Sequence, residues 1–196
     1  MDWLATITWQ PGIGDPTVMG WVTVLAYFSV AWFAFVNARI SRNKPSIAAH
    51  REVLFWVGLT VLMVALGINK QLDLQSLMTD IGRIAAREYG WYARRHDVQI
   101  LFIGALATGA LGFMLGLLWL LRNSLQRVSL AVVGLALLLA FVGIRASSFH
   151  GMDRLIGWEF VGIRMNWILE LGALGLIGTN AWALLRRKAI TSGSGL

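Results

Sequence analysis

Residues 53–73 read VLFWVGLTVLMVALGINKQLD, a mostly apolar run that ends in Asn69, Lys70 and Asp73. A helix needs about 17–25 mostly apolar residues to cross the hydrocarbon core of a bilayer. The apolar part, residues 53–68, is slightly short, so we expect the helix to include some of the polar residues that follow. The stretch therefore predicts a membrane-spanning helix with ionisable side chains at one end.

Four other stretches have the same character. The five predicted spans lie near residues 19–37, 53–68, 98–121, 128–144 and 167–185. The fourth span, like the second, is short and is expected to extend into the polar residues after it. Backbone groups that face lipid find hydrogen-bond partners only within a helix or a closed barrel. The sequence thus predicts an all-α fold, a polytopic bundle of five transmembrane helices forming one domain over residues 1–190.

The composition supports a membrane protein. Of the 196 residues, 57% are hydrophobic and 14% are charged, and the mean hydropathy is +0.65. Soluble domains usually have about 25% charged residues. The chain has no cysteine, which excludes disulfides, thiolate zinc sites and cysteine-bound iron–sulfur clusters. The net charge of +7 comes from basic residues beside apolar runs, so we expect contact with lipid surfaces and no nucleic acid.

Lysines and arginines near the span ends predict the orientation. Nine lie in short segments on one side: Arg39, Arg42, Lys44, Arg51, Arg122, Arg127, Arg186, Arg187 and Lys188. The other side has eight, spread over a longer length of chain with nine of the ten acids. Because basic residues near span ends favour the cytoplasmic side, we expect the N-terminus outside and the C-terminus inside. Residues 1–20 do not resemble a cleavable signal peptide, and residues 191–196 have the composition of a flexible linker.

Three further patterns concern packing. Apolar residues recur at helical spacing within residues 69–97, which predicts an amphipathic helix on the outer face that ends near Gly90. Small residues that permit close helix packing lie on the third span (Ala105, Gly109, Gly112 and Gly116) and on the fifth (Gly172, Ala173 and Gly175). Tryptophans near the span ends, Trp21, Trp56, Trp91, Trp119, Trp158, Trp167 and Trp182, are expected to anchor the chain at the lipid interfaces.

Polar residues at three span ends predict a site near the outer interface. Charged groups at hydrocarbon depth are costly and commonly functional. His150, with Asp153 beside it, and Glu170, one turn into the fifth span, are the candidate catalytic residues. The candidate substrate-binding residues are Asn69, Lys70, Asp73, Arg145, Ser148 and Asn166. Arg145 is the favoured partner for Glu170.

Several interpretations of these residues remain open. They can form an enzyme site acting on a lipid or lipid-linked substrate, or a structural ion-pair network in a non-enzymatic accessory or scaffold subunit of a membrane complex. A transporter or a haem- or metal-binding protein is a third possibility. His96 and His150 are the residues for such a metal, but no paired-histidine pattern occurs, so we assign no metal ligand and leave the cofactor unknown. Membrane lipids, a membrane protein and a second copy of the chain are the expected partners.

Four strings resemble a family of small bacterial inner-membrane proteins: residues 67–75 (GINKQLDLQ), 90–92 (GWY), 144–150 (IRASSFH) and 166–172 (NWILELG). The resemblance implies a multi-pass protein of the bacterial inner (plasma) membrane, and it supplies no activity. Some members carry the label isopropylmalate isomerase. That activity depends on a cysteine-bound iron–sulfur cluster, which this chain cannot hold.

Overall fold

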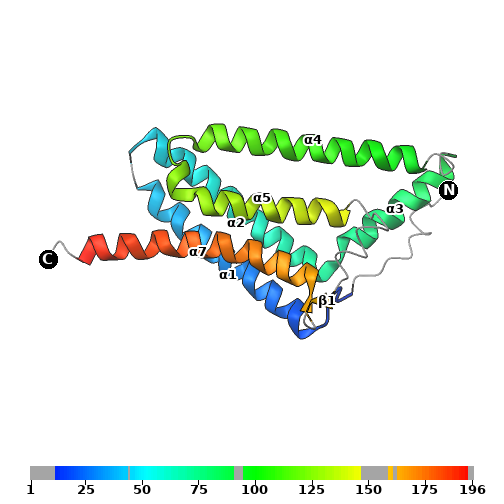
Figure 1. The fold of residues 1–196 in the computed structure, drawn as a ribbon, viewed down its shortest axis with the longest axis horizontal. Coiled ribbons are helices and arrows are strands. Elements are labelled where there is room, and N and C mark those ends of the chain that lie inside the picture. Colours follow the sequence, from blue (N-terminus) through cyan, green and yellow to red (C-terminus); the bar gives the residue numbers. More distant parts are fainter. Residues whose placement is uncertain (1–11, 44, 91–94, 147–158, 161–162, 194–196) are drawn as a thin grey trace.

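Five long helices and one shorter helix make up the computed structural model, which describes residues 12–43, 45–90, 95–146, 159–160 and 163–193 (Figure 1). The long helices are α1 (Val18–Arg42), α2 (Ile47–Leu72), α4 (Arg95–Leu121), α5 (Leu125–Ala146) and α7 (Met165–Gly193). Each is long and apolar enough to cross a membrane. The all-α fold with five candidate spans is therefore confirmed.

The helices are longer than the apolar runs that predicted them. α2 continues to Leu72 and α5 to Ala146, so both include polar residues after their apolar runs, as expected. α7 continues to Gly193, three residues into the segment with a linker-like composition. The described part of the chain also contains a short hairpin, in which β1 (Glu159–Phe160) pairs antiparallel with β2 (Ile163–Arg164) just before α7.

Local side chains explain where the first helices begin. The hydroxyl of Thr17 accepts a hydrogen bond from the Gly20 amide at 3.0 Å, and the hydroxyl of Ser46 accepts one from the Ala49 amide at 3.1 Å. Such caps satisfy amides that have no partner within the first turn. The loops before α1 and α2 therefore end at residues that suit helix initiation.

A left-handed backbone at Asp73 separates α2 from α3 (Leu74–Glu88). Its φ of 47° ends α2, and α3 then leaves at an angle towards the start of α4 (Figure 1). Asp is among the few residues besides glycine that tolerate this conformation. Gly90 follows α3 with a φ of 70°, which agrees with its predicted role in ending the amphipathic helix.

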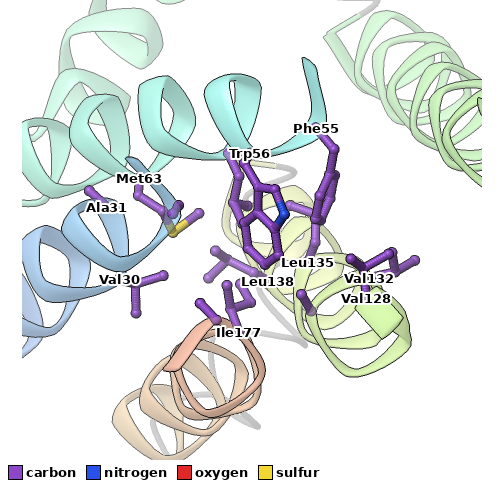
Figure 2. Close-up of a cluster of buried hydrophobic side chains, with 14 of the residues drawn as sticks. Val30, Ala31, Phe55, Trp56, Met63, Val128, Val132, Leu135, Leu138 and Ile177 are labelled. Atoms are coloured by element: carbon purple, nitrogen blue, oxygen red, sulfur yellow. The ribbon is translucent and has the colours of Figure 1, made fainter. Parts of the chain in front are cut away.

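The hydrophobic core lies between α1, α2, α5 and α7. In Figure 2 the indole of Trp56 points from α2 towards Leu138 of α5 and Ile177 of α7. Trp56 is only 1% exposed. The prediction that Trp56 anchors the chain in lipid is therefore wrong, whereas Trp21, Trp119 and Trp182, predicted in the same way, are exposed.

Close helix contacts occur at other glycines than those predicted. A Cβ on Gly134 of α5 would lie 2.8 Å from the Ala173 carbonyl oxygen of α7, and one on Gly67 of α2 would lie 3.1 Å from the Tyr27 Cβ of α1. By contrast, a Cβ on Gly109, Gly112, Gly116, Gly172 or Gly175 would meet nothing within 4 Å. Of the predicted small residues on α7, Ala173 alone packs tightly, being 1% exposed.

Helix α4, the third candidate span, has the smallest buried fraction of the five spans. Only 6% of the α4 span is buried within the chain, against 33–39% for the other four. Its core-facing side chains, Met114, Leu117, Leu118 and Leu121, lie on the opposite side of the helix from the glycine stripe. The stripe of Gly109, Gly112 and Gly116 therefore faces away from the bundle.

Two asparagines join helices through the backbone. The Asn37 side-chain amide of α1 donates to the Ala181 carbonyl of α7 at 2.9 Å. The Asn180 amide donates to the Arg127 carbonyl at 3.0 Å, and its oxygen accepts from the Ala131 amide at 3.2 Å. These contacts fix α7 against α1 and α5, so both asparagines have structural roles.

Candidate functional site at the Glu170 end of the bundle

Four helix ends meet at one end of the bundle. We call it the Glu170 end: α1 and α7 begin there, and α2 and α5 finish there (Figure 1). At the opposite end, called the Glu52 end, α1 finishes, α2 begins and α4 connects to α5. Because several helices begin or end with polar residues at the Glu170 end, ionisable side chains from separate helices can meet there.

Glu170 is the centre of this polar group. It lies one turn into α7 and is only 3% exposed. The Tyr27 hydroxyl of α1 donates to one of its carboxylate oxygens at 2.9 Å, and the Lys70 ammonium of α2 donates to the other at 2.8 Å. A buried carboxylate costs free energy unless it is paired and hydrogen-bonded. Both conditions are met by residues of two other helices.

Asp15 extends the group towards the chain before α1. Its carboxylate lies 3.8 Å from the Lys70 ammonium and accepts a 2.6 Å hydrogen bond from the Thr17 hydroxyl. Burial alone would raise the pKa of Asp15, but the Thr17 hydrogen bond and the Lys70 charge hold it below its usual value. Asp15, Tyr27, Lys70 and Glu170 are called the Glu170 cluster below.

The backbone around Asp15 is attached to the end of α2. The Gly14 amide donates to the Gln71 carbonyl at 2.7 Å, and the Gln71 side chain hydrogen-bonds to both the amide and the carbonyl of Asp15, each at 3.3 Å. A Cβ on Gly14 would lie 2.9 Å from the Asp73 Cβ, so only glycine fits without a shift. These contacts hold the Asp15 carboxylate beside Lys70.

Two more polar residues border the cluster. Arg145, at the end of α5, lies close enough to act electrostatically on the Tyr27 hydroxyl. Because the cluster has two carboxylates and one ammonium, this second cation brings the local charge towards balance. The side-chain oxygen of Asn166, one turn before Glu170 on α7, is buried and accepts no hydrogen bond from the described residues.

The structure brings together part of the site predicted from the sequence. Lys70 and Glu170 are in direct contact, and Arg145 and Asn166 lie at the same end. Lys70 is the ion-pair partner of Glu170, whereas Arg145 was the favoured choice. The backbone carbonyl of Asn69 accepts a hydrogen bond from the Asp73 amide at 3.0 Å. Ser148, His150 and Asp153 lie outside the described residues, as do Trp91 and Trp158.

Two residues of the cluster, Tyr27 and Asp15, are not among those predicted from the sequence. Tyr27 is the only one of the three tyrosines that falls inside a predicted span. A buried phenol normally has a hydrogen-bond partner, so this position was a usable signal. Asp15 precedes the first span in a Gly-Asp-Pro segment, and nothing in its local pattern indicates that it folds back onto α2.

A second buried ion pair lies at the Glu52 end. Glu52 of α2 is 3% exposed, and Arg127 of α5 donates to its carboxylate at 3.1 Å. The Arg127 side chain is 43% exposed, whereas that of Lys70 is 7% exposed. Glu52 is thus as buried as Glu170, but in the described part of the chain no tyrosine hydrogen-bonds to it and no second acid pairs with its cation.

Among the described residues, no group of three or more histidine, aspartate or glutamate side chains is placed to hold a metal ion. His96 of α4 is exposed. In comparisons with known proteins, the chain matches no family model, no curated protein and no solved structure. The chemistry of the Glu170 cluster is therefore the basis for assigning a function.

Proposed function

We propose that the protein is a multi-pass enzyme of the bacterial inner membrane that acts on a lipid or lipid-linked substrate at the outer interface. In this proposal the chain is oriented with its N-terminus outside, so that the Glu170 end meets the outer leaflet. The observation that carries it is the buried Glu170 carboxylate, held by a tyrosine hydroxyl and a lysine ammonium from two other helices.

The chemistry that this group supports is proton transfer. Glu170 accepts hydrogen bonds from a phenol hydroxyl and an ammonium group, so three ionisable side chains meet in an arrangement typical of general acid–base sites. The buried Asn166 oxygen, which has no donor among the described residues, supplies an acceptor for a substrate hydroxyl or amide. In the proposed enzyme, His150 and Asp153 belong to the same site.

A lipid-turnover assay tests this function. Purified protein in nanodiscs of bacterial polar lipid extract is incubated, and mass spectrometry follows new lipid species over time. We expect Glu170→Gln and His150→Gln to lower turnover by about 10²–10⁴-fold, the usual contribution of a general acid or base.

Glu52→Gln is the matched control, because Glu52 is as buried as Glu170 and is also ion-paired. It should leave turnover unchanged in protein that remains folded. An absence of any new lipid species in the wild type, or equal losses in Glu170→Gln and Glu52→Gln, would contradict the enzyme proposal.

The exposed face of α4 supports a second candidate, a non-enzymatic accessory subunit of a membrane complex. The stripe of Gly109, Gly112 and Gly116 faces away from the bundle, and small residues allow another helix to approach closely. In this alternative the Glu170 cluster is a structural ion-pair network.

Copurification after mild extraction tests the alternative. A partner membrane protein should be retained by the wild type and lost from Gly112→Leu. Leu111→Phe, which enlarges an exposed side chain away from the stripe, is the control. Isolation of the wild type without any partner would contradict the accessory role.

A further inference from the structure

A cavity of about 390 Å³ lies at the Glu52 end, between the last turns of α1 and the first turns of α2. It is lined by Phe35, Ala38, Arg39, Ser41, Arg42, His50, Val53 and Val57. Small-molecule sites typically occupy roughly 300–1,000 Å³, so this cavity is large enough for part of an organic ligand. It is separate from the Glu170 cluster, which lies at the other end of the same two helices.

The polar part of the cavity is basic. Arg39, Arg42 and His50 are exposed, and the lining contains no acidic residue. Glu52 is the one acid between residues 39 and 52, and it does not offset this charge, because it is buried and paired with Arg127. The cavity is lined by both the last turn of α1 and the first turn of α2, whose helix dipoles oppose each other, so its charge comes from the side chains. The cavity therefore favours an anion.

The remaining walls are apolar. Phe35, Ala38, Val53 and Val57 come from the two helices, and the Arg39 guanidinium lies 5.0 Å from the centre of the Phe35 ring. An arginine held against an aromatic ring loses less conformational freedom when it binds a ligand. Phe35, Val53 and Val57 lie within the predicted spans, so an acyl chain can contact them while its phosphate reaches the arginines, whereas a free anion makes no contact with this apolar part.

We propose that this cavity binds an anionic phospholipid, with the phosphate between Arg39 and Arg42 and the upper part of an acyl chain against Phe35, Val53 and Val57. Guanidinium groups form charge-assisted hydrogen bonds with phosphate oxygens. Basic residues near a membrane surface also favour anionic over zwitterionic lipids. The site is independent of the enzyme proposal and of the accessory alternative.

Native mass spectrometry of the detergent-solubilised full chain measures the binding. The protein is titrated with dioleoyl phosphatidylglycerol and with dioleoyl phosphatidylcholine, which differ in net charge but share a phosphate and two acyl chains. We expect the wild type to retain one phosphatidylglycerol with an affinity roughly tenfold or more above that for phosphatidylcholine.

Two variants test the two halves of the cavity. Arg39→Gln/Arg42→Gln should abolish the preference for phosphatidylglycerol, because it removes the cations. Val57→Trp should weaken binding of phosphatidylglycerol at least several-fold by filling the apolar part, and Val57 is 46% exposed, so the larger side chain does not enter the core. Melting temperatures of both variants confirm that they remain folded.

Arg186→Gln/Arg187→Gln is the matched control, because both arginines are exposed on α7 at the same end and the change in net charge is equal. It should keep the preference. Equal losses in the two double variants would overturn the proposal in favour of general surface charge. Displacement of the lipid by inorganic phosphate, together with no effect of Val57→Trp, would overturn it in favour of a site for the bare anion.

Discussion

Lys70 and Glu170 show how a charged pair is accommodated among apolar helices. The Lys70 ammonium lies 2.8 Å from the Glu170 carboxylate and 3.8 Å from that of Asp15. The Tyr27 hydroxyl donates to the other oxygen of Glu170. Removing one partner of a buried pair leaves the other charge without compensation, which costs more than removing both. The coupling between the two residues can therefore be measured directly.

We predict that Lys70→Met lowers the free energy of unfolding by about 3–5 kcal/mol, because Glu170 then remains buried without its cation. The double variant Lys70→Met/Glu170→Gln should recover much of that loss. Thermal or denaturant unfolding in a single detergent provides both values. If the losses of Lys70→Met and of Glu170→Gln simply add in the double variant, the two residues are not coupled as the geometry indicates.

The lowered pKa of Asp15 predicts that the stability of the protein depends on pH in the acidic range. Because the pKa of its carboxyl is lower in the folded protein, its contribution to stability is present above the ordinary value of 3.8 and is lost as the pH falls through the folded value. The melting temperature of Asp15→Asn should therefore fall less than that of the wild type as the pH is lowered below about 4. Parallel curves for the two proteins would contradict this role.

At the scale of the helix, the apolar runs of the sequence predicted the positions of the five long helices well. Residues 53–68 and 128–144 were short for a bilayer, and the helices include polar neighbours at both ends. Helix contacts were predicted less well, because spacing shows which residues share a face but not which face meets another helix. Gly109 and Gly134 are both glycines in apolar helices, yet Gly134 alone has a close neighbour.

We predict that Gly134→Val destabilises the protein by about 1–3 kcal/mol, since the side chain would collide with the Ala173 carbonyl and Ile177 of α7. Gly172→Val provides the comparison, because a Cβ there meets nothing within 4 Å. Unfolding in detergent measures both changes. Similar losses at the two positions would indicate a general effect of valine in these helices and not a specific contact.

At the scale of the whole molecule, the polar site was only partly predictable. The span ends carried visible charges, so the convergence of Lys70 and Glu170 could be inferred from the orientation of the helices. The positions of the helices around one another determine that Lys70 pairs with Glu170 and that Asp15 lies beside the end of α2. That positioning depends on contacts such as Gly67 against Tyr27 and Gly134 against Ala173, and neither glycine was among the predicted packing residues.

The orientation in the membrane is a prediction for the whole chain. Reporter fusions at residue 43, between α1 and α2, and after residue 193 should report the cytoplasm, and a fusion at residue 90 should report the outer side. A fusion after residue 122 should agree with the first two. The reverse pattern would place the Glu170 cluster at the inner leaflet and would contradict the proposed outer-leaflet substrate.

The distance along the chain between Lys70 and Glu170, 100 residues, affects biosynthesis. At translation rates of about 5–20 residues per second, the ribosome needs roughly 5–20 seconds to reach the carboxylate after making the lysine. During that interval the ammonium has no Glu170, and its place near the end of a span allows it to remain hydrated. The carboxylate arrives only with α7, so insertion of that helix completes the Lys70–Glu170 pair.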